Sequence, residues 1–502
     1  RLRTFEARIT VKAGMHTVTT EFLKRTLAYE GVRPEHYPVF YNFHAMSQEE
    51  PSVTEVQIEG PYDVTSIGHE RISRQKIFSN YPKNSEEETE VAAEILSRLA
   101  RQAFRRPIAL SDTETLLNFY EQGHAEGGFE KGIQFALERI LVDPEFLFRV
   151  EAQPEGVAEG EAFQLSDLEL ASRIAFFLWS TLPDEELLSI AERGELRNPG
   201  VLEDQIQRML ADSRAQALVD NFAAQWLYLR NVDVVQPEVR FFPEFDGELR
   251  VAMRRETELF FASQLKEDRG VPEMMSANYT YLNERLAEHY GIPSISGSHF
   301  RRVEMDGEGR GGLIGQASIW TVTSYATRTS PVKRGKWVLE NLLGSPPPPP
   351  PGNIPPLPDA SEETEGLTLR QRFEQHRVDP VCASCHVKMD PLGFALENFD
   401  AVGKWRTHNA AGLELDTIGV LPDGTLMEGP AGLRAALMSQ EDEFARTVTQ
   451  KLMTYALGRG LEYYDQPAIR SVLQKSEPDG YRWSSIILGI VNSTPFQMRR
   501  AS

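Results

Sequence analysis

The sequence predicts a mainly α-helical, multidomain protein with a small N-terminal β segment. From Ser85 onward apolar residues recur at helical spacing, and several of these segments open with a Ser-x-x-Glu capping box. Before residue 80 the chain instead alternates crudely and is rich in Thr and Val, which is typical of strands. A length of 502 residues is sufficient for about three to four domains.

The composition argues against two classes of protein. The formal net charge of -21 disfavours a nucleic-acid-binding protein, because phosphate binding needs a basic surface. The longest apolar run, residues 174–179, is far shorter than the roughly 18 residues that a membrane-spanning helix needs. We therefore expect a protein that binds no nucleic acid and is not transmembrane.

Residues 1–80 are interpreted as part of a β domain. The stretch FEARITVKAGMHTVTTEFL alternates in polarity, and TEVQIEGPYDV predicts a second strand that ends at Gly60 and Pro61. Two or three strands do not form a stable sandwich alone. We expect the missing strands to precede Arg1 or to lie elsewhere in the chain.

A small helical domain is expected over residues 85–155. Ser85 and Glu88 form a capping box, and Pro107 stops the helix that they open. A second box at Ser111 begins another helix, and a third amphipathic segment completes the domain.

A larger helical domain is expected over residues 160–344. It opens with a capping box at Ser166 and continues in amphipathic segments with the spacing of bundle helices. One segment places Phe222 and Trp226 at helical spacing, where we expect core packing rather than cofactor contacts. The stretch YTYLNERLAEHYGI predicts a short helix that ends at Gly291.

A cationic cluster lies near the end of that domain, although the protein is acidic. Its members are Arg328, Lys333, Arg334 and Lys336. They either bind an anionic ligand or pair with acidic neighbours at the start of a helix. Both interpretations are open at the level of sequence.

A proline-rich linker is expected over residues 345–366. Six consecutive prolines favour polyproline II, a stiff spacer of about 3 Å per residue. Beyond it, the domain of residues 367–502 contains the stretch DPVCASCHVKMDPLGF. This stretch holds the two cysteines of the chain, Cys382 and Cys385, with His386 directly after the second.

The Cys-x-x-Cys-His motif has three chemical interpretations. It is the attachment signature for c-type haem, and Cys-x-x-Cys alone also occurs in redox dithiols and as half of a zinc site. No further cysteine exists to complete a zinc site, and no strand pattern precedes Cys382 as in a thioredoxin-like dithiol. We therefore expect one covalent haem c, with thioether bonds to Cys382 and Cys385 and with His386 as the proximal iron ligand.

The second axial ligand of the iron is less well specified. Met427, in the turn-rich stretch LPDGTLMEGP, is the favoured candidate. The alternatives, besides an open position, are Met453, His408 and His376. Met389 follows His386 by three residues on the same side of the iron, so we expect it to pack as an apolar residue.

Four long stretches resemble a known family. They are FQLSDLELASRIAFFLWSTLPDEELL, RTSPVKRGKWVLENLLGSPPPPPPGNIP, CASCHVKMDPLGFALENFDAVGKWR and KLMTYALGRGLEYYD. They resemble multidomain proteins of Planctomycetes and related bacteria, in which the domains DUF1595, DUF1592, DUF1588 and DUF1585 occur in series. The resemblance implies a secreted or cell-envelope protein with a cytochrome-c-like C-terminal part and a β domain similar to carbohydrate-binding modules. The residues of this sequence that match the functional residues of the family are Cys382, Cys385 and His386.

The leading hypothesis is a c-type cytochrome that transfers single electrons in the periplasm or at the cell surface. Bacterial c-type haem is attached outside the cytoplasm, so we expect a leader before Arg1. The partner would be a redox protein, and polysaccharide or the cell envelope is a further candidate. The alternatives are a peroxidase-like haem enzyme with an open distal site, and a carbohydrate-binding or structural cell-surface protein in which haem is a fold element.

Overall fold

The computed structural model describes residues 72–305, 309–348, 370–371, 380–409 and 412–501, with short pieces of the first 62 residues. The protein is mainly α-helical, with 56% helix and 6% strand, which confirms the predicted class. Most of the expected β domain over residues 1–80 and of the proline-rich linker lies outside the described residues. The described pieces at residues 5–11 and 55–60 carry no strand.

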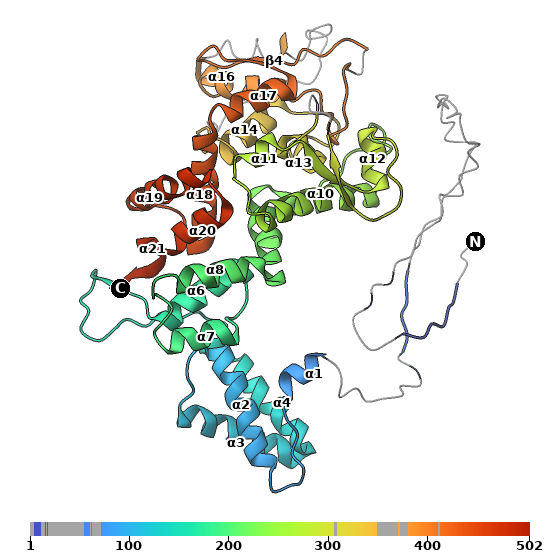
Figure 1. Ribbon diagram of the computed structural model, residues 1–502. Helices are drawn as coiled ribbons and strands as arrows, with labels where there is room; N and C mark the ends of the chain where they lie inside the picture. Colours follow the sequence, from blue (N-terminus) through green and yellow to red (C-terminus); the bar gives the residue numbers. More distant parts are fainter. Residues whose placement is uncertain are drawn as a thin grey trace. The chain divides into compact units, whose positions relative to one another are not determined.

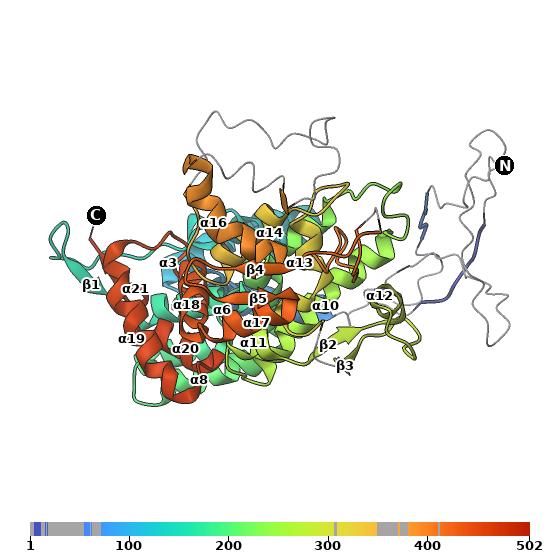
Figure 2. The ribbon, with the colours of Figure 1, turned by 90° about the horizontal axis from the view of Figure 1, so that it is seen from above.

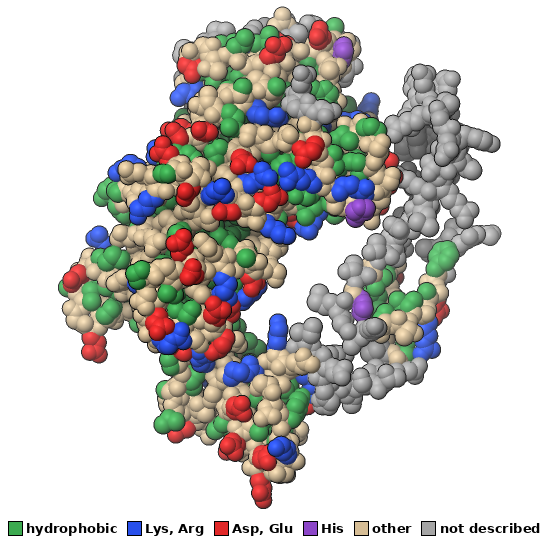
Figure 3. Space-filling model, in the orientation of Figure 1, with side chains coloured by type: hydrophobic (Ala, Val, Ile, Leu, Met, Phe, Trp, Pro, Cys, Tyr) green, Lys and Arg blue, Asp and Glu red, His purple; other side chains and the backbone are tan. Residues whose placement is uncertain are grey.

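The chain divides into two compact units. One comprises Arg1–Leu99 with Leu110–Arg139, and the other comprises Ala100–Ala109 with Ile140–Ser502. On the face seen in Figure 3, acidic and basic side chains are interspersed over the described surface. The division into four domains and a proline-rich linker stays a prediction about which parts fold independently.

The first unit is built on helices (Figure 1). They are α1 (Ile72–Ile77), most of α2 (Glu88–Phe104), α3 (Leu110–Gly127) and most of α4 (Phe129–Leu141). A Cβ on Gly132 would lie 2.5 Å from the ring of Tyr120, so α3 and α4 approach closely at this glycine. His124 joins α3 to α2, since its Nε2 lies 2.6 Å from Glu88 Oε2.

The second unit contains the longer list of elements. Its helices are α5 (Pro144–Leu147), α6 (Asp167–Trp179), α7 (Glu185–Glu192), α8 (Val201–Ala211), α9 (Ala224–Trp226), α10 (Gly247–Lys266), α11 (Glu273–Ser276), α12 (Glu284–Tyr290), α13 (Ala317–Val322), α14 (Pro331–Asn341), α16 (Pro380–Phe394), α17 (Gly429–Met438), α18 (Glu441–Leu457), α19 (Gln466–Ser476), α20 (Trp483–Val491) and α21 (Thr494–Gln497). Its antiparallel strand pairs are β1 (Ala162–Gln164) with β6 (Met498–Arg500), β2 (Tyr279–Leu282) with β3 (Arg301–Glu304), and β4 (Ile418–Val420) with β5 (Leu426–Glu428).

One hydrophobic core runs through most of this unit. It extends from Leu170 in α6 through Trp337 in α14 and Leu392 in α16 to Phe496 in α21. The pairing of β1 with β6 brings the start of α6 close to the end of the chain. Buried side chains therefore come from both sides of the proline-rich segment.

Several expected elements are confirmed. Ser166 caps α6 through a complete capping box with Glu169. Phe222 and Trp226 are buried and stack on each other with ring centroids 5.6 Å apart. The helix around them differs from the expectation in one respect, because Leu218–Ala223 is π-helical.

The expected helix in YTYLNERLAEHYGI is wrong over its first four residues. Tyr279–Leu282 form β2 instead, and the aromatic and β-branched residues of this stretch suit a strand paired with β3. Asn283 then caps α12, its side chain accepting a hydrogen bond from the Leu286 N–H. The helix ends at Gly291, as predicted, with a φ of 71°.

Candidate functional site

Helix α16 carries the Cys-x-x-Cys-His motif on its N-terminal half. In Figure 2 the first turns of this helix extend past α14, on which its C-terminal half packs. Cys382 lies in the helix, but its side chain is outside the described part of the structure. Cys385 and His386 are partly buried. One helical turn separates the two cysteines, which places both on one face of α16.

The imidazole of His386 is held by a buried carboxylate. His386 Nδ1 lies 2.9 Å from Asp390 Oδ1, four residues later on α16. The side chain of His386 is 16% exposed and that of Asp390 is fully buried. A hydrogen bond at Nδ1 leaves Nε2 as the nitrogen that is able to bind a metal. Sequence reasoning missed Asp390, although the spacing of four residues on a helix was a usable signal.

Two glycines seat α16 directly on α14. A Cβ on Gly335 would lie 1.9 Å from the carbonyl oxygen of Met389, and one on Gly393 would lie 2.0 Å from that of Pro331. The helix backbones are therefore in contact at two points, which only glycine allows. Met389 is buried at this contact, so the expectation that it packs as an apolar residue is confirmed.

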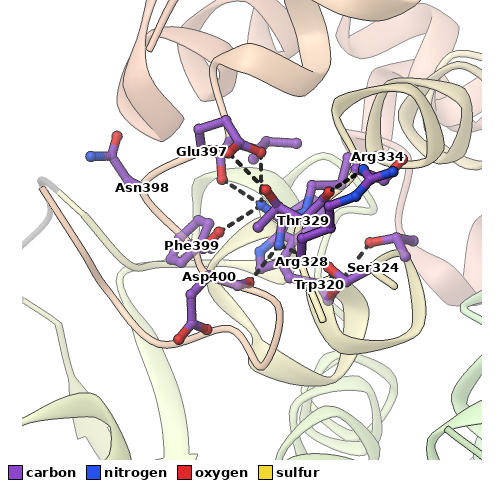
Figure 4. Close-up of polar contacts among 12 residues, drawn as sticks. Trp320, Ser324, Arg328, Thr329, Arg334, Glu397, Asn398, Phe399 and Asp400 are labelled. Carbon is purple, nitrogen blue, oxygen red and sulfur yellow. Dashed lines mark hydrogen bonds and ion pairs between the residues drawn. The ribbon is translucent and has the colours of Figure 1, made fainter. Parts of the chain in front are cut away.

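A buried arginine ties α14 to the loop that follows α16 (Figure 4). Arg334 donates hydrogen bonds to the carbonyl oxygens of Leu396, Phe399 and Asp400, at 2.6 to 2.9 Å. It also donates to Ser324 Oγ at 3.1 Å. Burial lowers the pKa of Arg334 to about 10. The guanidinium thus satisfies buried backbone carbonyls of the loop that follows α16.

The remaining members of the cationic cluster have different surroundings. Lys333 Nζ lies 3.9 Å from the ring centroid of Tyr325, and the guanidinium of Arg328 covers the same ring. Lys336 pairs with Glu340 at 3.4 Å along α14. Pairing with an acidic neighbour therefore describes Lys336 and also Arg334, whose Nη1 lies 3.6 Å from Glu397 Oε1 inside the protein.

The candidates for the second axial ligand lie in separate elements. Met427 is fully buried in β5, which pairs with β4, and Gly419 of β4 rests on the carbonyl of Pro391. Met453 is fully buried in α18. His408 is exposed, with Nδ1 2.9 Å from Thr407 Oγ1, and His376 lies outside the described residues. Both methionines are thus packed as core residues.

The donor chemistry of α16 fits a covalently attached haem. Two thiols one turn apart suit two thioether bonds, and the following imidazole has its Nδ1 held by a carboxylate. In the part of the chain that the structure describes, no group of three or more His, Cys, Asp or Glu side chains is arranged to hold a metal ion. None of the described helices is both long and apolar enough to cross a membrane.

Four family models match consecutive parts of the chain. Each is described as a protein of unknown function: DUF1595 at residues 91–151, DUF1592 at 165–292, DUF1588 at 310–409 and DUF1585 at 423–496. These are the domains of the cytochrome-c-like multidomain proteins of Planctomycetes. The chain belongs to this family. No curated protein and no solved structure matches it significantly.

The DUF1588 match has a bearing on the site. It runs from residue 310 to residue 409 and so includes α13, α14 and α16 together with the proline-rich segment between the last two. Arg334, the loop that it binds and the motif helix before that loop therefore belong to one family domain. The short name of this family, PSCyt3, agrees with a cytochrome-like character for the domain.

Proposed function

We propose that this protein is a c-type cytochrome with one covalently attached haem that transfers single electrons. The observation that carries the proposal is the motif helix, on which His386 follows Cys382 and Cys385 and is held at Nδ1 by buried Asp390. When bound, a haem supplies an iron centre that gains and loses one electron reversibly.

The residues of the chain have distinct roles in this proposal. Cys382 and Cys385 would hold the porphyrin edge, and His386 Nε2 would bind the iron. Asp390 orients the imidazole, and the glycine contacts of α14 keep α16 in place. No proton transfer by a general acid or base is needed, because electron transfer makes and breaks no bond.

The place and partner of this activity are also proposals. Covalent attachment of haem c suits the periplasm or the cell surface, and the family is cytochrome-c-like. The direct partner would be a redox protein. Polysaccharide or the cell envelope would be a further partner of the N-terminal segment.

The first test is a pyridine haemochrome assay. The full chain would be exported from a bacterial host that has the haem c attachment machinery, and we expect one covalent haem per chain. Cys385→Ala should abolish the thioether bond between residue 385 and the haem. The control variant Ser384→Ala changes an exposed neighbour and should leave the haem content unchanged. Unmodified thiols in the correctly exported wild-type protein would refute the proposal.

A second candidate function is a haem enzyme with an open distal site. The observation that favours it is the complete burial of Met427 and Met453. A high-spin spectrum with rapid binding of carbon monoxide would support the enzyme. A low-spin, six-coordinate spectrum that changes in Met427→Leu would support the electron carrier and assign Met427 as the distal ligand.

A further inference from the structure

We infer that Asp390 is a positioning residue that makes His386 a strongly donating iron ligand and so lowers the reduction potential of the site. This inference rests on the proposed function, because it needs a haem iron bound to His386. It concerns how the site is tuned, which the presence of the motif alone does not determine.

The geometry joins the two side chains firmly. His386 Nδ1 lies 2.9 Å from Asp390 Oδ1, and both residues belong to α16. The side chain of Asp390 is fully buried, and that of His386 is largely buried. Water therefore competes poorly for the hydrogen bond.

The packing of α14 holds this pair in register. The carbonyl of Met389, directly before Asp390, rests against Gly335 so closely that a Cβ there would lie 1.9 Å away. Gly393, three residues after Asp390, rests in the same way on Pro331. Asp390 thus projects from a stretch of backbone that is fixed on both sides.

The charge of the acceptor gives this contact its chemical consequence. A carboxylate draws the Nδ1 proton more strongly than a neutral acceptor does, which makes Nε2 a stronger electron donor to a bound metal. A buried negative charge also favours the ferric state, which carries one more positive charge than the ferrous state. Both effects act in the same direction and lower the reduction potential.

The test compares reduction potentials of haem-loaded full-length variants at one pH. Asp390→Asn keeps the shape of the side chain and an oxygen acceptor but removes the charge. We expect its ratio of reduced to oxidised protein at a fixed ambient potential to rise at least tenfold, which is about 59 mV for a one-electron couple. Asp390→Glu, which restores the charge, should stay within threefold of the wild type.

A matched control removes another buried carboxylate. Asp465 is also fully buried and pairs with Arg459 at 2.7 Å, away from the motif helix in sequence. Asp465→Asn should leave the ratio within twofold of the wild type. An equal rise in both Asn variants, or no rise in Asp390→Asn with haem attached, would overturn the inference.

Two further results separate this inference from the proposed function. Absence of covalent haem in the wild type would defeat the proposed function itself, whereas haem-loaded variants with equal potentials defeat only the role of Asp390. If Asp390→Asn does not fold, the wild type supplies the test instead. The rate of hydrogen exchange of the His386 Nδ1 proton would then be measured in the ferrous carbon monoxide form. Slow exchange supports the buried contact, and exchange within the dead time of mixing contradicts it.

Discussion

At the scale of single residues, the second unit contains two buried titratable side chains whose pKa values are shifted in opposite directions. Glu256 is fully buried and accepts hydrogen bonds from Thr280 Oγ1 at 2.7 Å and Tyr290 Oη at 2.6 Å, and burial raises its pKa to about 7. His289 is buried with Nε2 2.9 Å from the carbonyl oxygen of Val402, and burial lowers its pKa to about 4. The two groups lie on α10 and α12, which pack together.

These pKa shifts predict opposing effects of pH on stability. Folded His289 binds a proton less readily than unfolded His289, so its contribution to stability rises from pH 4 to 6.5. Folded Glu256 binds a proton more readily than unfolded Glu256, so its contribution falls from pH 4.5 to 7. Each changes the free energy of unfolding by about 2 kcal/mol between about pH 5 and pH 7, and in the wild type the two largely cancel.

Substituting one residue at a time should reveal the separate pH-dependent contributions of Glu256 and His289 to the free energy of unfolding. In Glu256→Gln the free energy of unfolding, measured with urea at pH 5 and pH 7, should increase with pH by about 2 kcal/mol relative to the wild type. In His289→Gln it should decrease with pH by a similar amount. Equal pH dependence in the wild type and both variants would contradict the assignment.

At the scale of elements, the packing of α16 on α14 depends on two glycines, which have no side chain. Gly335 and Gly393 let α14 and α16 touch through their backbones, and Arg334 then binds the carbonyls beyond the end of α16. Helix packing usually needs interdigitating side chains at interaxial distances of about 8–10 Å. Here the backbones meet at Gly335 and Gly393, so the position of the motif helix depends on two residues that lack a side chain.

Gly335→Ala should therefore destabilise the protein. The new methyl group would overlap the carbonyl of Met389, and overpacking of this kind costs about 1–3 kcal/mol or more of the free energy of unfolding. Gly247→Ala is the control, because a Cβ at this exposed first residue of α10 meets nothing within 4 Å. Chemical denaturation should show a large loss for the first variant and a change within about 0.5 kcal/mol for the second. Equal stability of the two would refute the close contact.

At the scale of the whole molecule, the second unit has a core shared across the proline-rich segment. Trp226 in α9 donates its indole N–H to the carbonyl of Asn341, and its ring lies 6.4 Å from that of Phe444 in α18. Arg173 in α6 binds the carbonyl of Phe496 near the end of the chain. Elements from several family domains thus bury one another.

This shared core predicts that the part of the second unit before the prolines does not fold alone. A fragment of residues 140–345 would expose the apolar faces that contact α16, α18 and α20. We expect it to lack sharp side-chain NMR signals and to bind the dye ANS, whereas residues 140–502 should unfold cooperatively. A well-folded fragment would instead support separate domains on the two sides of the linker.

Much of this protein was accessible from local sequence. The capping box at Ser166, the αL end of α12 at Gly291 and the helical spacing of Phe222 and Trp226 depend on residues within a few positions of one another. The Cys-x-x-Cys-His motif is local in the same sense. Cys382, Cys385 and His386 lie within five consecutive residues, and the family match to the series of domains agrees with the motif.

The tertiary structure decided what local spacing leaves open. Tyr279–Leu282 became a strand because β3 pairs with it, and Arg334 became a buried clamp because carbonyls distant in sequence lie around it. The desolvation that shifts the pKa values of Glu256 and His289 is likewise supplied by several elements at once. Helix periods and caps are properties of neighbouring residues, whereas hydrogen-bond partners and burial depend on segments that meet only in the folded chain.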